Sequence, residues 1–175
     1  LIAPNTTPAT INSFGNINEV LNNATDATIT VTYTFTLSTN GCTNLNKQVV
    51  NVQVKPAPKL SSTLTPPAIC SGATFSYAAT SNTFNVVFNW SRTSVVGINE
   101  PVTSGIGNIN ETLSNPTYSA VIVPYNFTLN ANGCTNVQSV FVTVNPVLTV
   151  PDQTSSTCSN SNFSFKAPNT PDTTV

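Results

Sequence analysis

A twelve-residue stretch that occurs twice, 92 residues apart, constrains the fold more than any other feature of the sequence. It occupies residues 33–44 and again residues 125–136. In each copy Tyr, Phe and Leu alternate with small polar residues, which is the period-2 pattern of a strand with one buried face. Each copy then reaches an Asn-Gly pair, at Gly41 and at Gly133, and this dipeptide readily supplies the positive φ angles of a tight turn. A Val-rich segment follows each turn, so the sequence predicts a β-hairpin that recurs.

The spacing of the two copies predicts a chain built from domain-sized repeats. Solenoid and propeller repeats are shorter, at most about 50 residues. Residues 15–21 return as residues 107–113 at the same spacing. We therefore expect one complete repeat over residues 57–146, preceded by the C-terminal part of a repeat over 1–56 and followed by the N-terminal part of another over 147–175. Prolines stand at both boundaries of the complete repeat, where they suit stiff linkers.

The composition favours an all-β fold. Charged residues make up 6% of the chain, against about 25% in ordinary globular domains, so residues for exposed helix faces are scarce. Thr and Val suit strands, and Asn and Ser suit turns. We expect strands near residues 59–64, 73–79, 84–92, 109–114, 119–130 and 137–144. Short strands separated by turn signals are typical of an immunoglobulin-like β-sandwich. Its expected core includes Phe75, Tyr77, Trp90, Val123, Tyr125 and Phe127.

Several short motifs follow one another in a fixed order through the complete repeat. They are Cys70-Ser71-Gly72, the run from Phe88 to Arg92, the run from Gly107 to Glu111 and the run from Asn132 to Asn136, before a Val-rich strand that ends at Pro146. This order resembles the PKD-like repeats of Bacteroidetes surface adhesins, and most of all those of gliding-motility adhesins. The resemblance implies a tandem array of sandwich domains, type IX secretion, display on the cell surface and surface attachment during gliding. It implies no catalytic residue and no cofactor.

The residue types present exclude several kinds of chemistry. The chain has no His, which excludes Ser-His-Asp and Cys-His nucleophile systems and His-ligated metals. Glu100 and Glu111 could form a glycosidase pair, and Asn108, Asn110 and Glu111 come nearest to a calcium loop. We favour solvated acids and turn caps over both. Five Lys and Arg cannot form a nucleic-acid surface, and no apolar run is long enough for a membrane helix.

Two aromatic residues and one cation are candidates for ligand contact. Trp90 alternates with Val86 and Phe88, so we expect it in the core rather than in a carbohydrate platform. Tyr118 follows an Asn-Pro-Thr turn sequence and is the better candidate for an exposed aromatic ring. We assign Arg92, together with Tyr118, to a ligand surface. The alternative is that Arg92 has a structural role beside Trp90 and satisfies polar groups at the end of its strand.

The four cysteines are Cys42, Cys70, Cys134 and Cys158, and we expect no disulfide between any two of them in one copy of the chain. Cys70 is placed at the start of a strand and Cys134 at the turn after another strand that runs parallel to it. Those positions are at opposite poles of a sandwich, whereas a disulfide needs Cα atoms within about 7 Å. Bridges between successive repeats are expected instead, with partners outside residues 1–175.

The expected function is mechanical and adhesive. The chain is interpreted as a stalk segment and adhesive surface of a secreted cell-surface protein, and its partners are neighbouring repeats and surface polysaccharide or a solid substratum. Many hydroxyl and amide groups with few charges suit glycans and hydrated solids. Two alternatives remain: a carbohydrate-binding accessory module of a secreted glycan-degrading enzyme, and a structural subunit of an extracellular filament. A catalytic segment in the parent protein would favour the module, and a long run of repeats would favour the adhesin.

Overall fold

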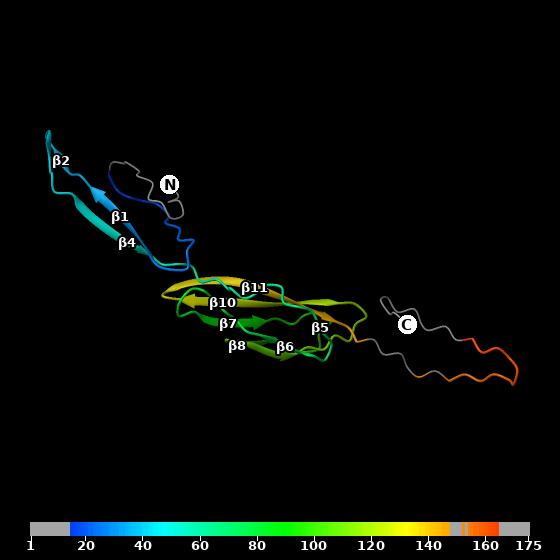
Figure 1. Cartoon of the computed structure of the whole chain (residues 1–175). Coiled ribbons are helices and arrows are strands. Elements are labelled where there is room, and N and C mark those ends of the chain that lie inside the picture. The colour runs from blue at the N-terminus through cyan, green and yellow to red at the C-terminus, as the bar shows by residue number, and fades with distance from the viewer. Residues whose placement is uncertain (1–14, 148–151, 153, 165–175) are drawn as a thin grey trace.

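The described part of the protein is built from strands. We analysed a computed structural model that describes residues 15–147, 152 and 154–164 (Figure 1). These residues contain eleven strands and no helix, which confirms the all-β prediction. The start of the predicted first repeat, at residues 1–14, and most of the predicted third repeat lie outside the described residues.

A five-stranded sheet forms the larger layer of the sandwich. Its strand order is β5, β11, β10, β7, β8, and only the β5–β11 pair is parallel. The strands are β5 (Ile69–Cys70), β11 (Cys134–Asn145), β10 (Val121–Ala131), β7 (Val87–Arg92) and β8 (Thr103–Ile106). The long β10–β11 hairpin is the centre of this sheet, since every other strand pairs with it directly or through β7.

A second, two-stranded sheet covers the inner face of the first. It consists of β6 (Thr74–Tyr77) and β9 (Ile109–Thr112), which pair antiparallel. The apolar side chains of both layers meet between them and are fully or almost fully buried: Phe75, Tyr77, Ile109, Leu113, Val123, Tyr125, Phe127, Leu129, Val140, Val142 and Val144. The aromatic rings touch across the interface, with ring centroids 5.3 Å apart for Phe75 and Tyr125 and 5.7 Å apart for Tyr77 and Phe127. The predicted core is therefore confirmed for these residues.

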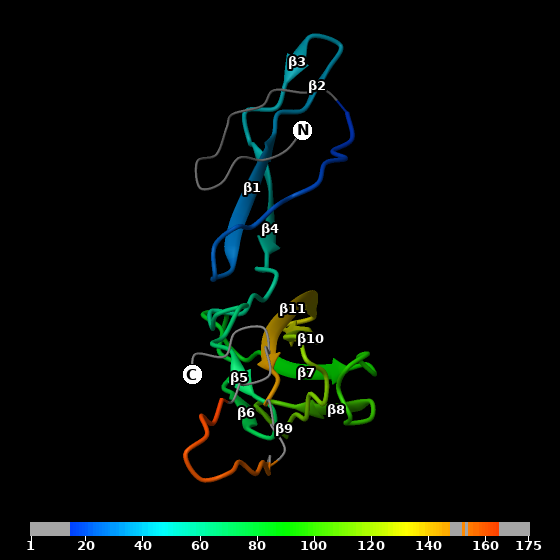
Figure 2. The same ribbon diagram turned by 90° about the vertical axis from the view of Figure 1, so that its right-hand side faces the viewer.

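The N-terminal part of the described chain forms a separate hairpin. Strands β1 (Ile29–Phe35) and β4 (Gln48–Val54) pair antiparallel, and β2 (Ser38–Thr39) and β3 (Cys42–Thr43) extend the pair to its tip. Both views show this hairpin on one side of the sandwich and residues 154–164 on another (Figures 1 and 2). The predicted Asn-Gly turns are confirmed, because φ is 47° and 80° at Asn40 and Gly41, and 53° and 84° at Asn132 and Gly133.

The predicted strand at 59–64 is wrong. This segment divides its hydrogen bonds between the two layers: Ser61 N–H donates to the carbonyl of Thr80, and Phe141 N–H donates to the carbonyl of Leu64. A chain that changes layers within four residues cannot complete a ladder with either. Two strands were not predicted, β5 and β8, and both are too short for a period-2 pattern to be visible. The strand predicted from residue 84 begins at Val87, after Asn85 with its φ of 58°.

Trp90 packs at the edge of the core rather than inside it. Its side chain is half-buried, and its ring meets that of Tyr125 edge-on with centroids 5.8 Å apart. Gly105 lies opposite Trp90 in the β7–β8 ladder. A Cβ atom at Gly105 would lie 2.6 Å from Cζ2 of the indole, so the close approach of strand and ring requires glycine here.

We predict that Gly105→Ala destabilises the sandwich by about 1–3 kcal/mol, because the added methyl forces the indole of Trp90 out of its place. The single Trp of the chain makes its fluorescence a direct reporter of this movement. Denaturant unfolding monitored at Trp90 would measure the change. Ser104→Ala, at the exposed neighbour of Gly105, is the control and should change the free energy of unfolding by less than about 0.5 kcal/mol. Equal stability of Gly105→Ala and the unaltered chain would contradict the prediction.

Candidate functional site

The outward face of the five-stranded sheet is the candidate functional surface. Side chains that alternate with the core residues of β10 and β11 point away from the second layer. The ladders align Ser139, Asn126, Ser91 and Ser104 in one row across four strands. A neighbouring row contains Thr128 and Asn89, and Asn130 and Thr135 follow toward the turn. We call these eight residues the polar sheet face.

The polar sheet face is uncharged and rich in hydrogen-bonding groups. It combines hydroxyl and amide side chains, so it can both donate and accept. Two cross-strand bonds fix part of it: Ser139 Oγ donates to Asn126 Oδ1 at 2.7 Å, and Thr135 Oγ1 donates to Asn130 Oδ1 at 2.7 Å. Such a surface suits neutral, hydroxyl-rich ligands better than ions.

Exposed apolar side chains border the polar sheet face. Val137 and Ile106 stand at the two ends of the row that holds Thr128, and Phe141 and Ile122 flank it toward the far end of β10. Polar groups next to small apolar patches are the combination that sugar rings match, since a ring presents both hydroxyls and C–H faces. Among the described residues no flat aromatic platform crosses this face.

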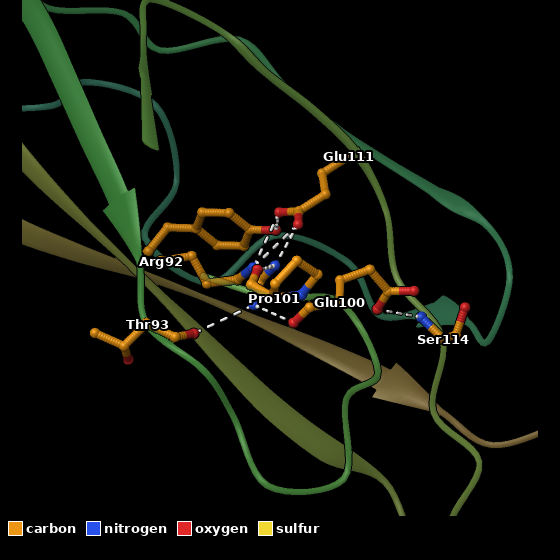
Figure 3. A network of polar contacts seen from close by, with 7 residues as sticks. Arg92, Thr93, Glu100, Pro101, Glu111 and Ser114 are labelled. Carbon is orange, nitrogen blue, oxygen red and sulfur yellow. Dashed lines mark hydrogen bonds and ion pairs between the residues drawn. The ribbon is translucent and has the colours of Figure 1, made fainter. Parts of the chain in front are cut away.

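Arg92 does not belong to any exposed surface, so its assignment to a ligand surface is wrong. Its side chain is 0% exposed. It continues the inward alternation of Phe88 and Trp90 along β7, and it turns into the edge of the core (Figure 3). The alternative, that Arg92 satisfies a strand end, is what the structure has.

Every nitrogen of the Arg92 guanidinium has a partner. Nε donates to Glu111 Oε2 at 3.0 Å, and Nη2 donates to Glu111 Oε1 at 2.5 Å. Nη1 and Nη2 also bind the backbone carbonyls of Thr93, Glu100 and Pro101, at 3.2, 3.3 and 2.6 Å. The Glu111 carboxylate raises the pKa of Arg92. Burial of this charge is tolerated because the pairing is bidentate and complete.

The carboxylates considered for catalysis are committed to internal partners. Glu111 binds Arg92 and also accepts a hydrogen bond of 2.5 Å from the hydroxyl of Tyr125. Glu100 Oε2 accepts the N–H of Ser114 at 2.9 Å. Burial alone would raise the pKa of Glu100, but hydrogen bonds from Ser114 and the charge of Arg92 together outweigh burial, and the pKa is lowered. The two acids therefore hold the loop after β7 and the strand β9 in place.

The oxygens considered for calcium are also occupied. Asn108 Oδ1 accepts the N–H of Ala79, and Asn110 Oδ1 accepts the hydroxyl of Ser76, both at 3.2 Å. The second bond joins β9 to β6 on the exposed side of the small sheet, and the first joins the residue before β9 to the segment after β6. In the described part of the chain no group of three or more His, Cys, Asp or Glu could hold a metal ion.

Tyr118 is exposed, as the turn sequence before it predicts. Its side chain is 79% exposed. It lies just before β10, at the same end of the sandwich as Cys70 and Asn145, which pair in the β5–β11 ladder. The corresponding residue 92 positions earlier is Asp26, whose carboxylate accepts a 3.5 Å hydrogen bond from Asn82. Tyr118 is thus placed at an end of the sandwich and not on the polar sheet face.

Asn115 is a structural residue that the sequence analysis missed. Its amide nitrogen donates to the carbonyls of Ser119 and Val144, both at 2.8 Å, and its oxygen accepts the N–H of Thr117 at 2.9 Å. The corresponding Asn23 makes the same bonds in the hairpin, to Ala27, Val54 and Thr25. The signal was present in the sequence, because Asn-X-Thr recurs here at the spacing of 92 residues.

A tyrosine–glutamate bond recurs at the same spacing. The hydroxyl of Tyr33 donates to Glu19 in the hairpin, as that of Tyr125 donates to Glu111 in the sandwich. The turn after Cys70 also has a counterpart. Ala73 N–H donates to the Cys70 carbonyl at 3.0 Å, and Ser161 N–H donates to the Cys158 carbonyl at 3.1 Å. Equivalent sequences therefore form equivalent local structure in three parts of the chain.

No disulfide joins any two of the four cysteines in the structure. Cys70 lies beside Asn145 at the end of β11, whereas Cys134 is the first residue of that strand. Cys42, Cys70 and Cys158 are exposed, and Cys134 is half-exposed.

No known protein family model matches this chain, and no curated protein matches it significantly. None of its described segments forms a helix long and apolar enough to cross a membrane. The functional interpretation therefore rests on the surface, the buried polar cluster and the recurring hydrogen bonds.

We predict that Glu111→Gln destabilises the sandwich by about 3 kcal/mol, because it leaves the buried charge of Arg92 without its counter-ion. Urea unfolding followed by Trp90 fluorescence would measure this loss. The matched control is Glu19→Gln, which changes the equivalent residue of the hairpin and should leave the unfolding of the sandwich unchanged. Equal stability of the Glu111→Gln chain and the unaltered chain would show that the ion pair is dispensable.

We also predict that the sandwich loses stability as the pH rises past about 10. Burial raises the pKa of Tyr125, the hydrogen bond to Glu111 raises it further, and burial raises the pKa of Tyr77. Above about pH 10 the unfolded chain has lost these protons while the folded chain keeps them, so the free energy of unfolding falls with pH. Urea midpoints measured from pH 8 to 11 should fall above pH 10, and less steeply for Tyr125→Phe. A constant midpoint over that range would contradict the prediction.

Proposed function

We propose that the chain is a non-catalytic segment of a large secreted cell-surface adhesin, built from tandem immunoglobulin-like repeats that act as stalk and adhesive surface. The observation that carries the proposal is the recurrence of whole hydrogen-bond sets at repeat spacing. The Asn23 and Asn115 sets match bond for bond, and so do the Tyr33–Glu19 and Tyr125–Glu111 pairs. Chance similarity of sequence would not preserve both partners of each bond.

The burial of the two hairpins supports the repeat. In β10, Val123, Tyr125 and Phe127 are fully buried under the small sheet. Their counterparts in β1, Val31, Tyr33 and Phe35, alternate in the same way but are only half-buried. An apolar strand face of this kind is stable when a second layer covers it. We propose that residues 1–56 are the second part of one repeat, 57–146 a complete repeat and 147–175 the start of the next.

The polar sheet face supports the adhesive role. It has no charge, and its hydroxyl and amide groups are held in rows by the ladders. A flat surface of this kind makes weak contacts with glycans or hydrated solids, and many copies along one stalk multiply such contacts into strong attachment. The resemblance to gliding-motility adhesins agrees with this role and with type IX secretion to the cell surface.

The carbohydrate-binding module and the filament subunit differ from the adhesin in the binding they predict. A module binds its glycan in one saturable site, whereas the adhesin surface binds weakly as a single copy and strongly as an array. A filament subunit associates with further copies of itself.

We predict that beads densely coated with the chain are retained on a hydrated polysaccharide film under flow, while the dissolved monomer binds it only weakly. The triple variant Ser91→Ala, Ser104→Ala, Asn126→Ala should lower retention severalfold, because it removes three of the four hydrogen-bonding side chains of one row. The matched control, Ser76→Ala, Asn110→Ala, Thr112→Ala, alters the outward face of the small sheet. Equal loss with both variants would contradict the assignment of the surface. Tight saturable binding of the monomer would favour the module, and self-association without retention would favour the filament subunit.

A further inference from the structure

The two cysteines of the complete sandwich cannot bond to each other. Cys134 is the first residue of β11, and Cys70 lies beside Asn145, the last of its 12 residues. A strand of this length spans about 36 Å at 3.3 Å per residue. A disulfide needs its Cα atoms within about 7 Å. Both thiols are nevertheless accessible, and each lies at one end of the sandwich.

The hairpin indicates where the counterpart of Cys70 would lie in the repeat before the sandwich. Val54 and Val144 are equivalent, because each pairs with the first residue of the partner strand, Ile29 or Val121. Lys55 is therefore the counterpart of Asn145. In the sandwich, Asn145 pairs with Cys70, and its carbonyl accepts the N–H of Ser71 at 2.8 Å. The counterpart of Cys70 in the preceding repeat, which we call the early cysteine of that repeat, would accordingly lie beside Lys55.

Lys55 in turn contacts the turn that carries Cys134. Its ammonium donates to the carbonyl of Asn132 at 2.8 Å, in the turn that Gly133 completes immediately before Cys134. Asn82 donates to Asp26 at 3.5 Å across the same junction. The early cysteine of the preceding repeat would lie beside the backbone of Lys55, and the side chain of Lys55 contacts the turn before Cys134. Lys55 thus places the early cysteine of one repeat close to the turn cysteine of the next.

We infer that successive repeats are joined by a disulfide between the early cysteine of one repeat and the Asn-Gly-Cys turn of the next. Cys134 bonds the early cysteine of the preceding repeat, and Cys70 bonds the turn cysteine of the following one. Bond formation removes one hydrogen atom from each thiol, and a disulfide such as oxidised glutathione takes up both as two reduced thiols. The inference rests on the repeat architecture proposed above, but not on adhesion.

Each bond would clamp one junction of the stalk. Two side-chain hydrogen bonds on exposed residues cross the junction, from Lys55 to Asn132 and from Asn82 to Asp26. A covalent link close to the linker at Pro56 would strengthen this junction and transmit force from one domain to the next. Oxidising conditions outside the cell allow such bonds to persist.

Two extended chains test the inference. In the first, a copy of residues 57–92 precedes Leu1, because the repeat spacing places Leu1 one position after Arg92. In the second, a copy of residues 88–146 follows Val175, which the spacing between Cys70 and Cys158 places at Val87. After refolding with reduced and oxidised glutathione, peptide mapping without reduction should find the added Cys70 linked to Cys134 in the first chain. It should find Cys70 linked to the added Cys134 in the second.

Controls separate this inference from the repeat architecture. Cys134→Ser in the first chain should leave the added cysteine free for thiol labelling, and Cys42 and Cys158 should label in every chain. A free Cys134 in the first chain together with a free Cys70 in the second overturns the inference, as does a Cys70–Cys134 bond inside the sandwich. Chymotryptic cleavage after Tyr33 and Phe35 reports the architecture independently. Protection of these sites in the first chain, measured with reductant present, supports the repeat even if no disulfide forms.

Discussion

The apolar face of the β10–β11 hairpin must be kept from water, and the arrangement of the sandwich follows from that constraint. Alternating residues of both strands place their larger side chains on one side, where Phe75, Tyr77 and Ile109 cover them. Each such side chain contributes about 1.5–3 kcal/mol when fully buried. The small sheet β6–β9 provides this cover, since its outward side carries only Thr, Ser and Asn. The β1–β4 hairpin has the same alternation without the same cover.

The edge of that core is closed by charge rather than by apolar packing. Arg92 reaches inward from the end of β7, and Glu111 pairs with it from β9. The hydroxyl of Tyr125, on β10, donates a further hydrogen bond to the Glu111 carboxylate. One cluster therefore ties both layers and the loop after β7 together. A buried ion pair of this kind adds specificity only when all its groups are satisfied, and the carbonyls of Glu100 and Pro101 provide the remaining partners. The cluster stabilises the fold and takes no part in the outward surface.

The local features of the fold could be predicted from the sequence, and the contacts between distant segments could not. The Asn-Gly turns, the long strands and the aromatic core all leave short-range patterns, and the structure has them. β8 leaves none, because four residues that include Gly105 have no visible alternation, and the strand exists through its pairing with β7. Arg92 shows a different limit. The alternation of Phe88 and Trp90 predicts that it points inward, but the charge suggested a surface position. Glu19 and Glu111 recur at the same spacing as Tyr33 and Tyr125. This recurrence was the sequence signal that Glu111 is a structural residue, and hence a partner for Arg92.

Amide hydrogen exchange on the unaltered chain distinguishes stabilisation by the covering small sheet from stabilisation by strand sequence alone. Exchange by global or local opening reports the stability of each segment. We expect amides of β10 and β11 to exchange orders of magnitude more slowly than those of β1 and β4, although the two hairpins share their pattern and register. Equal protection of both hairpins would show instead that β1 and β4 are stable without a covering layer.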